Sequence, residues 1–71
     1  MAIKIYVSDL LGKNKWTQKD LVQKTGIRPG TISALYHEDI KRLDINHLNK
    51  LCVALNCQPG DLLEYVPDQE N

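Results

Sequence analysis

The side chains of this 71-residue chain that are best suited to bind a metal are His37, His47, Cys52 and Cys57. The two cysteines lie five residues apart, about 140° around a helix, so they could share a metal only if the helix ended between them. Cys52 is more simply explained as a small core residue, since free cysteine is among the most buried residue types. The sequence therefore predicts no metal and no cofactor.

Catalytic groups in the arrangements that enzymes need are also missing from the sequence. There is no nucleophile with a neighbouring base, no pair of catalytic carboxylates and no glycine-rich phosphate loop. A chain of this length leaves little room for a pocket that excludes water. We therefore expect a binding protein and not an enzyme.

Charge is the next feature that bears on a binding partner. Nine Lys and Arg balance nine Asp and Glu, so the whole chain has no net charge. The two halves differ, because residues 1–37 carry a net charge of +4 and residues 38–71 carry −4. This asymmetry predicts a basic face, suited to a polyanion, and an acidic C-terminal part. An ordinary solvated surface is the alternative interpretation.

Length and composition predict one domain over residues 1–66, followed by a polar tail at residues 67–71. An apolar content of 42% with 25% charged residues is typical of folded chains. So small a domain buries only about 60% of the surface of its unfolded chain, which favours a homodimer. The N-terminal apolar stretch is too short for a membrane span, and two cysteines are too few for a disulfide-stapled secreted domain. These features predict a cytoplasmic protein.

The N-terminal segment has two competing periodicities. Ile3, Ile5 and Val7 alternate as in a strand, but the apolar residues of this segment also recur at helical spacing. We expect residues 2–6 to be extended and a first helix to follow over residues 7–13.

The next two helices have clear start signals. Thr17 can cap a helix over residues 18–25, with an acidic residue three positions later in a capping-box arrangement. Gly26 supplies the permissive backbone of a sharp turn. Pro29 is suited to the first position of a third helix, which we expect to run to about His37.

Two more helices are expected in the second half. Residues 38–44 form a polar loop whose last residue can cap a helix that ends at Asn56. A short last helix begins near Pro59 and buries Leu62 or Leu63. The predicted fold class is all-α, a bundle of five short helices with a short extended segment at its N-terminus.

Two short helices joined by a turn of about three residues with a glycine are typical of a helix-turn-helix. The sequences TQKDLVQKTGI at residues 17–27 and TISALY at residues 31–36 closely resemble the Cro and phage-repressor type helix-turn-helix of the Xre group. The resemblance continues through Lys41 and Arg42 to GDLL at residues 60–63. It implies a lambda-repressor-like bundle whose third helix lies in the major groove of double-stranded DNA.

The predicted third helix has a small outward face. A helical wheel places its large apolar residues on one side. The opposite side holds Gly30, Ala34 and His37, flanked by Thr31 and Ser33. In proteins that this chain resembles, the positions of Pro29, Gly30 and Ala34 often carry polar side chains that read bases.

Glycine and alanine cannot make the bidentate bonds to base edges that Arg, Lys, Asn and Gln make. We therefore expect a close approach of the helix backbone, hydroxyl contacts from Thr31 and Ser33, and contact of Ala34 with a thymine methyl. DNA shape should supply a larger share of the specificity than usual.

Contacts to the DNA backbone are also implied by the resemblance. Gln18 matches the glutamine with which the family holds a phosphate at the start of the second helix. Lys41 and Arg42 match the family's basic pair after the third helix, and His37 matches the phosphate-facing position at its end. Further cations near this face are Lys15, Lys19 and Arg28.

The loop after the third helix departs from the family pattern. The family's glycine is absent there, and Glu38 and Asp39 stand near its place. Two acidic residues beside the expected DNA face are predicted to weaken binding or to bend the loop away.

Together these observations predict a sequence-specific, double-stranded DNA-binding transcriptional regulator, acting as a repressor and as a homodimer. The expected dimer surface is Ile3, Ile5 and Tyr6, or Leu63, Tyr65 and Val66. The alternative is a protein-interaction or antitoxin-like module of the same fold with little DNA specificity, whose acidic segment 61–71 binds a protein partner. Net neutrality favours the alternative, whereas the matches at the phosphate-binding positions favour DNA binding.

Overall fold

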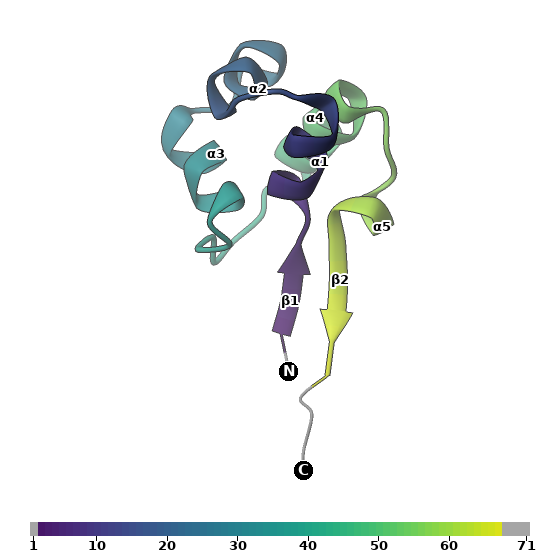
Figure 1. The fold of residues 1–71 in the computed structure, drawn as a ribbon. Helices are drawn as coiled ribbons and strands as arrows, with labels where there is room; N and C mark the ends of the chain where they lie inside the picture. Colours follow the sequence, from purple (N-terminus) through teal and green to yellow (C-terminus); the bar gives the residue numbers. More distant parts are fainter. Residues whose placement is uncertain (1, 68–71) are drawn as a thin grey trace.

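The architecture is a helical bundle with a two-stranded antiparallel ribbon extending from one end (Figure 1). The computed structural model describes residues 2–67. In chain order its elements are β1 (Ala2–Ile5), α1 (Val7–Asn14), α2 (Gln18–Thr25), α3 (Pro29–Tyr36), α4 (Ile45–Leu55), α5 (Pro59–Leu62) and β2 (Leu63–Val66). The prediction of five helices is confirmed, and the observed helix ends lie within one residue of the expected ones.

Three helices end at a residue in the left-handed region of backbone conformation. These residues are Lys15 after α1 (φ 58°), Gly26 after α2 (φ 73°) and Asn56 after α4 (φ 51°). Glycine adopts this conformation without a Cβ penalty, so the turn between α2 and α3 carries the least strain of the three. The predicted roles of Gly26 and Asn56 are both confirmed.

The end of α3 is a Schellman motif, with the same pattern of hydrogen bonds that ends α1 and α4. The Asp39 N–H donates to the Ala34 carbonyl at 2.8 Å, and the Glu38 N–H donates to the Leu35 carbonyl at 3.2 Å. Glu38 takes the left-handed conformation (φ 60°) that the motif requires and that glycine usually supplies. The motif ends α3 at Tyr36, one residue before the predicted end.

The second half follows its local signals. Asp44 caps α4, because its Oδ1 accepts a hydrogen bond from the Asn46 N–H at 2.7 Å. In α5, Leu62 is the buried leucine, while Leu63 is half-buried and begins β2. At 11 residues α4 is the longest helix, and none within residues 2–67 has the length and apolar content to cross a bilayer.

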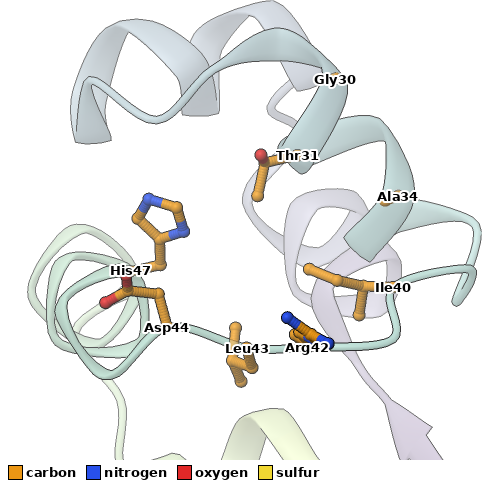
Figure 2. A pocket seen from close by; sticks show the side chains of 8 residues that line it. All are labelled: Gly30, Thr31, Ala34, Ile40, Arg42, Leu43, Asp44 and His47. Atoms are coloured by element: carbon orange, nitrogen blue, oxygen red, sulfur yellow. The ribbon is translucent and has the colours of Figure 1, made fainter.

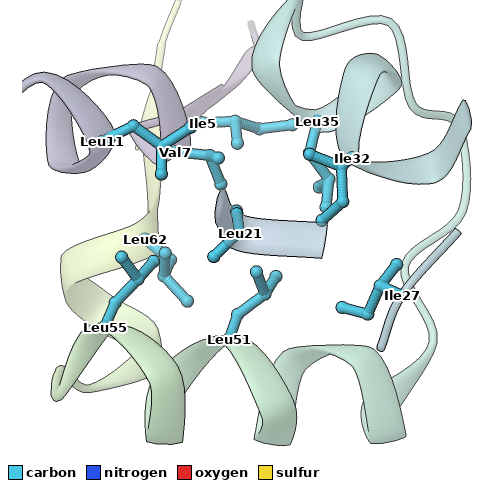
Figure 3. Packing of buried hydrophobic residues seen from close by; sticks show 10 residues of the cluster. All are labelled: Ile5, Val7, Leu11, Leu21, Ile27, Ile32, Leu35, Leu51, Leu55 and Leu62. Carbon is cyan, nitrogen blue, oxygen red and sulfur yellow. The ribbon is translucent and has the colours of Figure 1, made fainter. Parts of the chain in front are cut away.

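The core lies between the five helices and the upper part of the ribbon (Figure 3). Leu21 of α2 is at its centre with no exposed surface, and Ile27 seals the turn between α2 and α3 from below with 2% exposure. Every helix contributes at least one buried side chain to this cluster. Its members are Ile5, Val7, Leu11, Leu21, Ile27, Ile32, Leu35, Leu51, Leu55 and Leu62. The helix-turn-helix therefore shares its core with the rest of the domain.

The all-α fold class was wrong in one respect. The extended N-terminal segment is a strand, and Leu63–Val66 forms a second strand that pairs with it, with Ile3 opposite Tyr65 and Ile5 opposite Leu63. Nothing in the local sequence pattern had predicted β2. Ile5 is also buried, so it cannot belong to a dimer surface as expected, whereas Ile3 and Tyr65 are exposed.

The two faces of the ribbon differ in chemistry. On one face, the Tyr6 hydroxyl donates to the Glu64 carboxylate, a bond that raises the pKa of Tyr6, and the Lys4 Nζ lies 5.5 Å from the centre of the Tyr6 ring. The opposite face is apolar, because the register puts Ile3, Ile5, Leu63 and Tyr65 on the same side.

Candidate nucleic-acid interface

The helix pair α2 and α3 is joined by a three-residue turn over residues 26–28. The buried Thr25 hydroxyl donates to the Leu21 carbonyl at 2.7 Å and accepts from the Ile27 N–H at 3.1 Å. These bonds tie the last turn of α2 to the residue that seals the core. From this turn α3 buries Ile32 and Leu35, as predicted, so that its opposite face looks outward.

A hollow of about 440 Å³ lies beside the outward face of α3 (Figure 2). Gly30, Thr31 and Ala34 form the α3 wall, and Arg42, Asp44 and His47 are among the residues of the opposite wall. Gly30 is exposed, while Thr31 and Ala34 are half-buried. Because the α3 wall is made of small side chains, a ligand can approach the helix backbone closely.

The N-terminus of α2 presents free donors beside this helix pair. Thr17 Oγ1 accepts from the Asp20 N–H at 3.1 Å, and the Asp20 carboxylate accepts from the Thr17 N–H at 2.8 Å, which confirms the capping box. These backbone and side-chain hydrogen bonds to Thr17 lower the pKa of Asp20. The N–H groups of Gln18 and Lys19 have no hydrogen-bond partner within residues 2–67, and such donors suit an anion.

A family model supplies the context for this geometry. The model of the Cro/C1-type HTH DNA-binding domain matches residues 7–68. The chain belongs to the Cro/C1-type family. It is also 37% identical, over 70 residues, to a protein of Bacillus subtilis (strain 168) named uncharacterized HTH-type transcriptional regulator YozG, an alignment that covers 99% of this chain and 83% of that protein.

In this Cro/C1-type domain the basic pair after α3 is divided between two hollows. Arg42 lines the hollow beside α3 and also a second hollow of about 260 Å³ beside the ribbon. Lys41 lines the second hollow and not the first. Both side chains are exposed, but only Arg42 lines a hollow together with the outward face of α3.

His47 is a candidate site residue that the sequence had not indicated. Its residue type indicates only a possible metal ligand, yet it lies in the first turn of α4, half-buried, with its ring directed across the hollow toward Thr31 (Figure 2). A signal was present, because His47 lies four residues before the buried Leu51 and so faces the body of the Cro/C1-type domain.

Glu38 has a structural role and is turned away from the α3 hollow. Its Oε1 accepts a hydrogen bond from the Ile5 N–H at 3.1 Å, which ties the loop after α3 to β1. The loop is thus fastened to the ribbon, and the Glu38 carboxylate is directed to β1. The expectation that both acidic residues lie beside the DNA face is therefore wrong for Glu38.

The remaining predicted residues of the third helix lie at its two ends and on one shoulder. Arg28 is the exposed N-cap residue, followed by exposed Pro29 at the first helical position. Ser33 is half-buried on the shoulder of the helix. At the other end His37 is exposed, with its ring edge-on to Tyr36 at 5.1 Å between centroids. The Cro/C1-type domain thus carries polar groups at both ends of α3 and small side chains between them.

Proposed function

We propose that this chain is a transcriptional repressor that binds specific sequences of double-stranded DNA as a homodimer. In this proposal α3 lies in the major groove and the N-terminus of α2 contacts a phosphate. The observation that carries it is the hollow beside α3, where a wall of small side chains faces Arg42 and His47. Membership of the Cro/C1-type family supports DNA binding, and the name of the Bacillus subtilis relative, a transcriptional regulator, supports the regulatory role.

Sequence recognition in this proposal is divided between the two walls of the hollow. Gly30 and Ala34 let the α3 backbone approach the base edges but carry no donors. Arg42 has the planar donor fork that pairs with guanine, and a His47 ring nitrogen can donate to or accept from a base edge or a phosphate. Base contacts from the far wall and DNA shape therefore replace the long polar side chains that α3 lacks.

Affinity in this proposal comes from phosphate contacts. The free N–H groups at the start of α2, the guanidinium of Arg28 and the basic side chains of Lys41 and Arg42 supply them. Because the chain has no net charge, the long-range attraction to DNA is small. We therefore expect weak binding by one copy, with a strong dependence on salt.

Selection from random duplex DNA at two salt concentrations tests the proposal. We expect enrichment of a palindrome whose half-sites are centred about 10 base pairs apart, one turn of the double helix. In a transcription assay, a promoter that overlaps the enriched site should be less active when the chain is added. Selection without enrichment at low salt would contradict sequence-specific binding and favour the protein-interaction module.

Two variants separate phosphate binding from base recognition. Arg42→Ala should weaken binding and reduce the slope of log K against log salt by about 0.9 for each phosphate that the guanidinium neutralises in the original chain. Lys50→Ala is the matched control, because Lys50 is an exposed cation on α4 that lines neither hollow of Arg42. Ala34→Gln should change the preferred sequence at one position of each half-site, since the new amide can bond an adenine edge.

A further inference from the structure

Two free cysteines, Cys52 in α4 and Cys57 just beyond it, have no part in the proposed function. We propose that they form a redox-sensitive pair, in which a low-molecular-weight disulfide oxidises the two thiols to one disulfide within the chain. Neither cysteine lines the hollow beside α3, so this modification site is independent of the proposed binding of DNA.

Helix α4 ends between the two cysteines. Its last residue is Leu55, and Asn56 takes the left-handed conformation (φ 51°) that turns the chain back. On a continuous helix, residues five positions apart point about 140° away from each other, which would keep the two sulfurs apart. The end of α4 removes this obstacle, so the condition for the two cysteines to share one bond is met.

The turn that ends α4 places the two cysteines at positions whose side chains meet. The Cys57 N–H donates to the Cys52 carbonyl at 3.0 Å, and the Asn56 N–H donates to the Val53 carbonyl at 3.3 Å. These are the two hydrogen bonds of a Schellman motif, in which the side chains at the positions of Cys52 and Cys57 commonly pack on one another. The two residues are therefore neighbours in space on the same side of the turn.

Standard bond lengths limit the distance between the two Cα atoms. The path from the Cα of Cys52 through its carbonyl oxygen and the 3.0 Å hydrogen bond to the Cα of Cys57 is at most about 7 Å long. Bends along this path make the direct distance shorter. Disulfides join Cα atoms that are usually about 4.4–6.8 Å apart. The main chain at the end of α4 therefore already suits a disulfide.

The surroundings of the pair favour a neutral product. Burial raises the pKa of the Cys57 thiol, and the nearby Cys52 thiol and Asp61 carboxylate raise it further. Both cysteines are half-buried, so two thiolates at this place would be poorly hydrated and would repel each other. A disulfide has no charge and removes both effects.

A bond between the two sulfurs also explains the pair better than a shared metal does. Structural zinc sites use four ligands, whereas residues 2–67 contain no group of three His, Cys, Asp or Glu side chains that could hold a metal. Asp61 already has a partner, because its Oδ2 accepts a hydrogen bond from the Gln58 N–H at 2.9 Å and so caps α5. The two sulfurs are thus left to react with each other.

Cys57 is the cysteine that a small oxidant reaches first. It lines a hollow of about 350 Å³ whose other lining residues include Lys13 and Asn14 at the end of α1. Cys52 does not line this hollow. We therefore assign the first attack to Cys57 and the second to Cys52.

The reaction consists of two thiol–disulfide exchanges. The Cys57 thiol loses its proton and attacks one sulfur of the small disulfide, which forms a mixed disulfide and releases one small thiol that takes up a proton. The Cys52 thiol then loses its proton and attacks the Cys57 sulfur, which forms the bond within the chain and releases the second small thiol. The chain loses two electrons and two protons, and the small disulfide is reduced to two thiols. Because the raised pKa leaves little Cys57 thiolate at neutral pH, the first exchange is slow.

The bond would fasten α5 to the end of α4. The capping box of Gln58 and Asp61, which starts α5, follows Cys57 directly, and the Leu62 carbonyl of α5 accepts the Tyr6 N–H at the base of the ribbon. A cross-link reduces the conformational freedom of the unfolded chain, so the oxidised chain should have a Tm about 5–15 °C higher than the reduced chain. A Tm that is no higher would show that the bond distorts the turn, which would contradict the fit inferred above.

Equilibration of the full chain with mixtures of glutathione and glutathione disulfide tests the proposal by mass spectrometry. As the share of glutathione disulfide rises, we expect a monomer lighter by the mass of two hydrogen atoms, with no glutathione attached and no thiol that reacts with iodoacetamide. A chain that keeps both thiols in excess glutathione disulfide would overturn the proposal. So would glutathione that stays attached at equilibrium, or a disulfide between two chains.

Two single variants test the order of attack. Cys52→Ser leaves Cys57 without its partner, so this variant should stop at the mixed disulfide with glutathione. Cys57→Ser leaves only Cys52, which does not line the hollow, so it should take up glutathione more slowly. Faster uptake by Cys57→Ser would contradict the assigned order, and the test on the unmodified chain stands even if a variant fails to fold. None of these measurements uses DNA, so they succeed or fail separately from the proposed function.

Discussion

The contacts that stabilise the helix-turn-helix join residues close in sequence, whereas those that stabilise the ribbon join residues far apart in sequence. The capping box of α2 joins residues three positions apart, and the Thr25 hydroxyl bonds a carbonyl four positions away. In the ribbon, by contrast, Tyr6 bonds Glu64 across 58 positions, and Glu38 bonds the main chain of β1 across 33. The helix-turn-helix pair is therefore shaped by local rules, whereas the ribbon exists only when the rest of the chain is folded.

The largest expected effect comes from a substitution in the hydrophobic core that the helix-turn-helix and the ribbon share. Leu21 has no exposed surface at the centre of the common core, and Leu21→Ala should lower the free energy of unfolding by about 2–5 kcal/mol. Native domains have only about 5–15 kcal/mol in total, so both regions should unfold in one transition at much lower urea. Val53→Ala, at an exposed site on α4, should change stability by less than about 0.5 kcal/mol. Separate transitions of the helices and the ribbon would contradict a single core.

A smaller effect should separate the ribbon from the helix-turn-helix. Glu38→Ala leaves the partly buried Ile5 N–H without an acceptor, which should lower stability by about 1–3 kcal/mol. Glu38→Gln keeps an acceptor oxygen and the same backbone strain, so it should retain most of that stability. Amide exchange should become faster in β1 and remain slow in α2. Equal acceleration in both elements would show that the loop does not hold the ribbon separately.

The reverse experiment loosens the helix-turn-helix alone. Thr17→Ala removes the acceptor of the Asp20 N–H and should lower stability by about 1 kcal/mol. Thr17→Ser keeps the hydroxyl and serves as the control. We expect faster amide exchange in the first turn of α2 with no change in the ribbon, measured on the same samples. If amide exchange in β1 accelerated as much as in α2, the start of α2 would not be stabilised by local contacts alone.

The smallest effect is a dependence on pH. Hydrogen bonds to Thr17 lower the pKa of Asp20 in the folded chain, so its carboxylate adds stability that is present above the pKa of the unfolded chain. This contribution is lost as pH falls through the lowered pKa. Asp20→Asn should therefore flatten the acid side of a plot of Tm against pH and leave neutral pH less stable. If the slope of Tm against pH on the acid side were the same in Asp20→Asn, the ionisation of Asp20 would not contribute to stability.

Local signals accounted for most of the fold and for much of the candidate site. Capping residues, Pro29 and Gly26 predicted the helix ends because each acts within one turn of its own position. The helical wheel predicted the outward face of α3 for the same reason, since Ile32 and Leu35 define the buried side. The role of Glu38 was missed because its acceptor function depends on a strand far away in the sequence.

By itself, then, the sequence determined the five helices, the turn between α2 and α3, and the membership of the Cro/C1-type family that these imply. Only the tertiary structure decided the pairing of β2 with β1 and the place of His47 across the hollow from Thr31. It also decided that Arg42 lines the hollow beside α3 while Lys41 lines only the hollow beside the ribbon. The physical reason is the range of the contacts. A helix end is set by neighbours within a few residues, whereas a strand pair or a hollow forms only when distant segments pack on a common core.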